Sequence, residues 1–464
     1  MFLLNMLIYM SMHRNFLIWI FLAVITVLSV SCSSDDKEVI SSGKALNQQK
    51  VQQVKIRWLG QWYNEGKKET LIREMAREFE FLNQDIDIEL QFPYQMAQID
   101  SFADPFRRVA DTILSWVQDD RWPFDIFVCD KWFYEDVAKV SGDDFWGQKH
   151  LVDFKNEKWF KDAHKDYVLN SPEYIGNFGD IAPGAFIEGM WDLLFVSSEV
   201  ENKLGIKVKD YDMTMDDFIE YARIVHQYNQ SHPDKITLCA TNYKSIEFLM
   251  SHVILTEIGD VRKSSSAEQL AAISNVFKKL EILSKYNPVE QYHVYANDRE
   301  LKHDKALFHL HSTWVTMFWQ RSNPEGEKLM RPCEFPSMPG KKAQAYAGTY
   351  NAIFAIPKKA RNKDAAIRFM KYMSTVDIAE KWEKYSKCPT GLNSRISVNE
   401  FGTDAFGNLS KHMIKKYDNR MAEIVLAKDL FNGNQRHLNF HVFDVANGNM
   451  TADQAVNSIR SQMR

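Results

Sequence analysis

The sequence lacks the short motifs that mark the common catalytic and cofactor-binding sites. It contains no nucleophile elbow, P-loop, dinucleotide-binding fingerprint or zinc-binding helix motif. Its five cysteines are widely spaced and form neither a CxxC nor a Cys/His metal pattern. These absences favour a binding protein over an enzyme, and they predict that the protein uses no cofactor and no metal ion.

The chain also lacks a large excess of charge of either sign. Its 57 Lys and Arg residues and 61 Asp and Glu residues give a formal net charge of −4 at pH 7, so we expect no nucleic acid partner. With 464 residues, 45% hydrophobic and 25% charged, the chain is an ordinary soluble globular protein with room for two or three domains. Aromatic residues are abundant, with 12 Trp, 18 Tyr and 30 Phe. Carbohydrate-binding proteins and aromatic-rich cores both show this bias.

Long apolar runs are absent except near the N-terminus. Phe16–Val30 is a stretch of fifteen uncharged residues, FLIWIFLAVITVLSV, that follows His13 and Arg14. An uncleaved membrane-spanning helix is one interpretation, but such a helix needs about 20 apolar residues. A cleaved signal peptide over residues 1–31 fits the layout better.

The end of this run resembles the lipobox of bacterial lipoproteins, in which a cysteine becomes the acylated N-terminus. The residues are Ser29, Val30, Ser31 and Cys32, and the pattern departs from the usual one because Leu28 stands one place too early. The resemblance implies a lipid anchor at Cys32, which places the protein in the cell envelope, on the periplasmic or outer-surface side of a bacterial membrane. The polar residues 32–52 are then a flexible tether.

The remaining cysteines fall into two pairs by their surroundings. Cys129 and Cys239 lie in apolar, strand-like runs, which predicts buried thiols. Cys333 and Cys388 each lie in a Pro-containing loop, and an exported location permits a disulfide between them.

Alternation of strand and helix patterns begins at Val54. The run VKIRWLG alternates like a strand, apolar residues recur at helical spacing over 68–83, and 86–92 alternates again. A second helix is expected over 102–118, followed by the short apolar strand in PFDIFVCD, the kind that a parallel sheet buries. Repeated alternation of this type predicts an α/β protein.

Five segments in order resemble the extracellular solute-binding proteins of bacterial ABC transporters, the carbohydrate-binding group often called family 1. They are VKIRWLGQWYNEG with LIREMAREFEFLNQDIDIELQF, DLLFVSSEVENKLGIK with MTMDDFIEYARIV, DKALFHLHSTW, AGTYNAIFAIPKKARNKDAAIRFMKYMSTVDIAEKW and NGNMTADQAVNSI. The chain departs from the family pattern at His311 and Ser312, where glycines are usual, and at FVSS over 195–198.

The resemblance implies a two-lobed, type II-like periplasmic-binding-protein fold in which crossing hinge strands join the lobes. Lobe 1 is expected at 53–180 and 346–388, and lobe 2 at 181–345 and 389–464 with the C-terminal helices across the hinge. The implied partners are a small solute, a mono- or oligosaccharide, and the permease subunits of an ABC transporter.

Candidate ligand-binding residues follow from the rule that ligands of open α/β sheets lie beyond the carboxyl ends of the strands. Sugars present hydroxyls to carboxylates and amides, and CH faces to flat aromatic rings. The rule selects Gln61, Trp62, Asp130, Trp132, Asn242 and Tyr243, and the family pattern adds Glu188, Trp191, Trp314 and Tyr350.

Several of these residues have a structural interpretation as well. Trp62 lies just past the first strand, whereas Trp58 lies inside it and is expected in the core. Asp130 is equally placed to cap the next helix. His309 and His311 alternate on one strand face, but two ligands without a third favour packing over metal binding.

Two alternatives to transport remain open. A surface lipoprotein of this fold could capture glycans without a transporter. A glycan-degrading enzyme would need two carboxylates about 5 to 10 Å apart, and Glu188 and Asp192 are the suggestive pair, one helical turn apart if that stretch is helical.

Overall fold

The structure is a computed structural model of the chain. It describes residues 53–62, 65–92, 105–163, 178–184, 187–241, 243–286, 289–291, 301–342, 346–352, 354–390, 403–417, 421–422, 430–431 and 440–463. The predicted signal peptide, Cys32, the tether and Asn242 lie outside these residues.

The first of two sheets has four strands in the order β10-β3-β1-β2. These are β1 (Val54–Leu59), β2 (Ile86–Gln91), β3 (Ile126–Val128) and β10 (Phe354–Ala355). The three strands β1, β2 and β3 are parallel, and β10 returns antiparallel beside β3. Two stretches distant in sequence therefore build one sheet.

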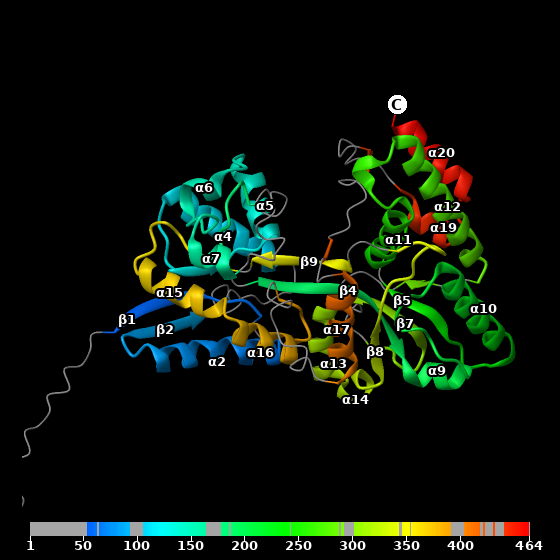
Figure 1. Cartoon of the computed structure of the whole chain (residues 1–464), viewed down its shortest axis with the longest axis horizontal. Coiled ribbons are helices and arrows are strands. Elements are labelled where there is room, and N and C mark those ends of the chain that lie inside the picture. The colour runs from blue at the N-terminus through cyan, green and yellow to red at the C-terminus, as the bar shows by residue number, and fades with distance from the viewer. Residues whose placement is uncertain are drawn as a thin grey trace, which may run out of the picture. The chain divides into compact units, whose positions relative to one another are not determined.

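Helices cover this sheet on both sides. They are α2 (Lys67–Leu82), α4 (Pro105–Asp119), α5 (Lys131–Ser141), α6 (Trp146–His150), α7 (Lys158–Ala163), α15 (Lys363–Met373) and α16 (Val376–Ser386). Figure 1 shows α2 and α16 below β1 and β2, and α4, α5 and α6 above them, while α15 contacts both α2 and β1. The sequence explains α2 directly, because Leu71, Ile72, Met75 and Phe79 recur at helical spacing and are all buried.

The second sheet has the strand order β11-β9-β4-β7-β5-β6, with β8 also paired to β4. Its strands are β4 (Ile187–Ser197), β5 (Thr237–Thr241), β6 (Val289–Gln291), β7 (Ala306–Ser312), β8 (Met330–Cys333), β9 (Tyr346–Ala352) and β11 (Met421–Ala422). Both parallel and antiparallel pairs occur. With two sheets of this kind and helices between the strands, the α/β prediction is confirmed.

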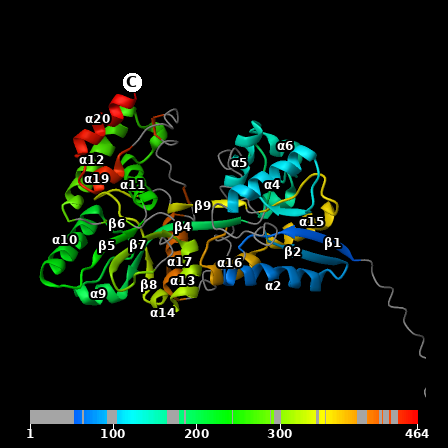
Figure 2. The same cartoon turned by 180° about the vertical axis from the view of Figure 1, so that it is seen from behind.

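Most of the remaining described helices lie between strands of the second sheet in sequence, and Figure 2 shows most of them from behind. They are α9 (Ser198–Leu204), α10 (Met215–Ser231), α11 (Tyr243–Ile258), η2 (Val261–Lys263), α12 (Ser266–Ser284), η3 (Thr313–Val315), α13 (Thr316–Ser322), α14 (Pro324–Glu327), α17 (Ala405–Tyr417), α19 (Val442–Ala446) and α20 (Ala452–Gln462). None of the helices in the described ranges is long and apolar enough to cross a bilayer.

The long strand β4 connects two hydrophobic cores. Its first half pairs with β9, and its second half pairs with β7 and β8. Because successive side chains of a strand point to opposite faces, Leu193 and Phe195 join the core that contains β1 and β3, while Leu194 and Val196 join the other core. β4 therefore places residues of both cores in one continuous strand.

The four described cysteines are free and buried. This confirms the prediction for Cys129 and Cys239, and the suggested disulfide between Cys333 and Cys388 is wrong. The Cys333 thiol donates to the carbonyl oxygen of Lys209 at 3.0 Å, while Cys388 Sγ accepts from Thr313 Oγ1 at 3.8 Å. Cys333 belongs to β8 rather than to a loop, which fixes it away from a partner cysteine.

Candidate binding site

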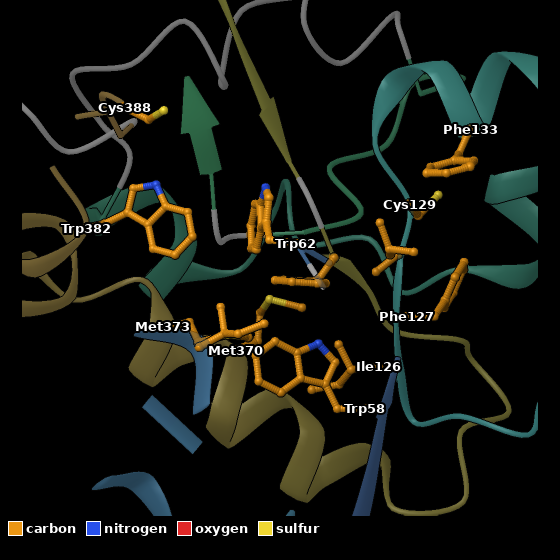
Figure 3. Close-up of a cluster of buried hydrophobic side chains, with 14 of the residues drawn as sticks. Trp58, Trp62, Ile126, Phe127, Cys129, Phe133, Met370, Met373, Trp382 and Cys388 are labelled. Carbon is orange, nitrogen blue, oxygen red and sulfur yellow. The ribbon is translucent and has the colours of Figure 1, made fainter. Parts of the chain in front are cut away.

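Trp62 follows the carboxyl end of β1 in an unusual backbone conformation. Its φ is 67°, in the left-handed region that few residues other than glycine adopt. This turn places the indole against Trp382, with ring centroids 4.7 Å apart, and against Phe354 at 5.8 Å. Figure 3 shows Trp62 near the centre of a group of buried side chains that includes Trp382 and Met370. The sequence rule therefore selected a residue that is largely buried and held in a strained turn.

Glu188 lies at the start of β4 and contacts Trp62 directly. The indole Nε1 of Trp62 donates a hydrogen bond to Glu188 Oε2 at 3.1 Å. The backbone of Glu188 is held opposite Asn351 of β9, and the next residue, Gly189, donates its N–H to Pro389 O at 2.7 Å. Two predicted ligand-binding residues, from β1 and β4, thus meet although 126 residues separate them.

Lys68 completes this cluster and was not predicted. Its Nζ lies 2.5 Å from Glu188 Oε1 and 5.7 Å from the Trp62 ring centroid, and only 1% of the side chain is exposed. Burial by itself lowers the pKa of Lys68, but Cys388, Glu188 and Glu65 outweigh burial and raise it. The sequence does carry a signal for this role, because Lys68 lies on the same face of α2 as its buried apolar residues.

Trp191 and Trp314 belong to the same hydrophobic core as Trp62. The Trp191 backbone N–H donates to Thr313 Oγ1 at 3.2 Å, and Thr313 in turn contacts Cys388. The Trp191 side chain is 0% exposed, so a ligand could reach it only after its neighbours move. Trp314 is half-buried, and its ring makes edge contacts with His311 at 4.8 Å and Phe318 at 5.5 Å.

Asp130 and Trp132 follow β3 at the start of α5. Asp130 caps this helix, because its Oδ1 accepts from the backbone N–H of Phe133 at 2.9 Å. Burial raises the pKa of Asp130 to about 6, although backbone hydrogen bonds oppose the shift. Trp132 is 44% exposed, and Lys131 Nζ lies 4.9 Å from its ring centroid. The capping role is therefore present, and the exposed indole beside it is free to offer a flat face to solvent.

For the other predicted ligand-binding residues, the structure gives less detail. Gln61 is half-buried beside Trp62. Tyr243 begins α11, and Tyr350 lies in β9 opposite Gly189 of β4, but the structure describes only their backbones. Asn242 is not among the described residues.

The histidine pair on β7 has a packing role. His309 is buried, and its Nε2 accepts from the backbone N–H of Lys302 at 3.2 Å. Burial lowers the pKa of His309 to about 4. His311 Nδ1 accepts from the N–H of Ser312 at 2.9 Å. Across the described part of the chain, no three His, Cys, Asp or Glu side chains are grouped to hold a metal ion.

Comparison with solved structures shows the same fold in sugar-binding proteins. The GacH receptor of Streptomyces glaucescens, solved unliganded and with acarbose, matches with a TM-score of 0.57 and 12% identity over 88% of this chain and 97% of that chain. The apo form of RafE from Streptococcus pneumoniae gives a TM-score of 0.58 and 12% identity, covering 88% and 97%. A sugar transporter from Rhizobium etli in an open conformation gives 0.58 and 13%, covering 88% and 98%.

These matches cover nearly the whole length of each protein, so the fold is that of periplasmic sugar-binding proteins. The sequence itself matches no protein-family model and no curated protein. At 12 to 13% identity the likeness establishes the fold and nothing finer.

Proposed function

We propose that this protein is a lipid-anchored, extracytoplasmic solute-binding protein of an ABC-type uptake system, and that its ligand is a neutral carbohydrate. The contact between Trp62 and Glu188 carries the proposal. It joins a carboxylate acceptor to an indole at the ends of β1 and β4, in a fold that other sugar-binding proteins share.

The chemistry of the candidate residues favours a neutral ligand. The set contains two carboxylates, Glu188 and Asp130, and neither Arg nor Lys. Of the two buried lysines beside these residues, Lys68 is paired with Glu188, and Lys131 lies over the Trp132 ring. Carboxylates accept hydrogen bonds from sugar hydroxyls, whereas they repel phosphates and sugar acids.

Aromatic rings supply the second half of the recognition. Covering about 100 Å² of an indole at roughly 25 cal/mol per Å² contributes about 2 to 3 kcal/mol. Trp132, exposed at the start of α5, and the half-buried Trp314 are the rings best placed to offer such a face. Two stacked rings and a carboxylate are then enough for micromolar binding once the ordering costs of association are subtracted.

The anchor and the division into lobes belong to the same proposal. Acylation at Cys32 would hold the protein at a membrane beside permease subunits. The predicted lobes, 53–180 with 346–388 and 181–345 with 389–464, would close on the ligand about the segments that join them, which include β4.

A thermal-shift screen tests the proposal, because a ligand that binds only the folded state raises the melting temperature. We expect shifts with neutral probes such as maltose, raffinose and xylo-oligosaccharides. We expect none with phosphorylated hexoses or amino acids. Shifts confined to the phosphorylated hexoses or to the amino acids would contradict the proposal.

The glycan-degrading alternative loses its suggested pair of carboxylates. Glu188 and Asp192 lie in β4, not in a helix. Four residues of a strand span about 13 Å, which exceeds the separation that glycoside hydrolysis uses. The Asp192 carboxylate accepts from Ser312 Oγ on the neighbouring strand.

His441 contacts an aspartate through one ring nitrogen and a serine through the other, as the histidine of a catalytic triad does. His441 lies 3.2 Å from Asp444 Oδ2 through Nδ1 and 2.9 Å from Ser458 Oγ through Nε2. Ser458, however, lies inside α20, where backbone N–H groups are bonded within the helix. A serine nucleophile needs such groups free beside it to stabilise an oxyanion. We therefore assign this contact to the packing of α19 against α20.

A further inference from the structure

Lys68 is placed where a lysine is unfavourable unless it has a partner. It is the second residue of α2, in the first turn, where the helix dipole disfavours a positive charge. Its side chain is also 1% exposed, which costs the hydration of the ammonium group. Something at this position must offset both costs.

The partner is the carboxylate of Glu188, which two donors hold from different elements. Lys68 of α2 lies 2.5 Å from Oε1, and Trp62, after β1, donates to Oε2 at 3.1 Å. The other titratable groups around the pair are Glu65 before α2 and Cys388 after α16, with Glu383 beyond Cys388. Lys68 is therefore the cation that balances Glu188 in this cluster.

We propose that Lys68 is a positioning residue, which keeps the Glu188 carboxylate ionised and fixed so that its remaining lone pairs can accept from the ligand. The inference rests on the proposed function only in naming a ligand. The ionisation and orientation of Glu188 are tested without one.

The change Lys68→Met removes the cation and keeps most of the side-chain volume. A buried carboxylate without its cation takes up a proton more readily, because burial disfavours the charged form. Loss of the cation in Lys68→Met is then expected to make the hydrogen bond between Trp62 and Glu188 depend on pH.

The hydrogen bond from Trp62 to Glu188 reports this change directly. With ¹⁵N-labelled tryptophan, the Trp62 indole N–H resonance, assigned through Trp62→Phe, is expected to stay constant with pH in the wild type. In Lys68→Met it shifts with pH. Lys68→Arg restores the constant resonance, and Lys68→Met combined with Glu188→Gln abolishes the pH dependence because no carboxylate remains.

A pH-independent Trp62 resonance in Lys68→Met would overturn the inference. If Lys68→Met does not fold, the double variant decides, since it leaves no unpaired buried charge and should fold. Failure of the double variant to recover folding would also overturn it, because the loss would then not come from Glu188.

The affinity for sugar tests whether Lys68 also affects ligand binding. With the neutral sugar that produces the largest thermal shift, Lys68→Met is expected to bind about tenfold or more weakly at low pH than at high pH, since a hydrogen bond to a charged group is lost. The wild type is expected to show a smaller difference, to which Asp130, with its pKa of about 6, also contributes. If the wild type binds no sugar while the Trp62 resonance behaves as expected, the proposed function fails and the role of Lys68 stands.

Discussion

At the scale of single residues, one side chain can serve the fold and the ligand at once. Asp130 caps α5, and it is also a candidate ligand-binding carboxylate. Burial raises its pKa from 3.8 to about 6. A group whose pKa is raised in the folded state stabilises the fold at low pH, and it loses that contribution as the pH rises through the folded pKa.

Asp130→Asn separates the two roles. Asparagine caps helices as well as aspartate does and carries no charge to bury. We expect the free energy of unfolding of the variant at pH 7 to exceed the wild-type value by up to about 3 kcal/mol. The difference should shrink as the pH falls from about 6 to 4. Denaturant unfolding across this range measures it, and a wild type that gains no stability relative to Asp130→Asn on acidification would contradict the assignment.

Trp132 is the clearest exposed aromatic among the candidates. Trp132→Ala should weaken sugar binding by about tenfold to a hundredfold, because a stacked indole contributes about 2 to 3 kcal/mol. The melting temperature should change little, since the ring is 44% exposed. Phe81→Ala is the matched control, because Phe81 is 78% exposed at the end of α2 and lies outside the candidate site. Equal calorimetric affinities for Trp132→Ala and wild type would exclude Trp132.

At the scale of elements, two buried carboxylates join α17 to its neighbours: Glu334, which follows β8, and Glu383 of α16. On β8's side, Glu334 accepts from His412 Nε2 at 2.9 Å, Lys416 Nζ at 2.9 Å and the Tyr417 hydroxyl at 3.0 Å. On the side of α16, Glu383 accepts from Ser410 at 2.5 Å. Because Leu409 and Met413 of α17 also belong to the core that contains β1, this helix couples that core to β8.

The pH dependence of the stability of Glu334→Gln tests whether Glu334 holds α17 in place. Burial alone raises the pKa of Glu334, but the hydrogen bonds from His412 and the charge of Lys416 lower it from 4.5 to about 2. A carboxyl group whose pKa is lower in the folded state than in the unfolded state stabilises the fold at pH values above its unfolded-state pKa. This stabilisation is lost as the pH falls through the folded-state pKa. The wild type should lose about 3 kcal/mol between about pH 4.5 and 2 through this group.

Denaturant unfolding of Glu334→Gln should lack that loss, and the variant should be less stable than the wild type at pH 7. Glu325→Gln serves as control, because Glu325 pairs with Lys328 on the surface with 82% of its side chain exposed. An exposed pair contributes little. Equal acid sensitivity of Glu334→Gln and the wild type would show that Glu334 does not hold α17.

Local patterns predicted the elements better than they predicted the site. The strand at 54–59 and the helix at 67–82 were predicted to within one or two residues, since period and burial are encoded locally. The capping box of Thr214 and Asp217 is present at the start of α10. After β9 and β10 the chain forms two helices, α15 and α16, which Ser374 and Thr375 separate.

The site depends on contacts that no local pattern contains. The meeting of Trp62 with Glu188 was not foreseen, although each residue was selected, because β4 and β1 approach only through the tertiary fold. Whether Glu188 and Asp192 face each other depended on the helical or extended state of 187–192, and the strand decides it. Lys68 was missed because burial of a lysine makes sense only when its partner is known.

At the scale of the whole molecule, the proposed function requires that a neutral sugar binds where Glu188 and Trp62 meet. The single change Glu188→Gln removes the charge and keeps the shape. Glu201→Gln is the matched control, since Glu201 of α9 is also buried but pairs with Arg331 of β8 rather than contacting Trp62.

Isothermal titration calorimetry of these three proteins with one neutral oligosaccharide is the most direct test. We expect micromolar binding by the wild type, an affinity about tenfold or more lower for Glu188→Gln, and an unchanged affinity for Glu201→Gln. Wild-type affinity in Glu188→Gln, or an equal loss in both variants, would contradict the proposed function.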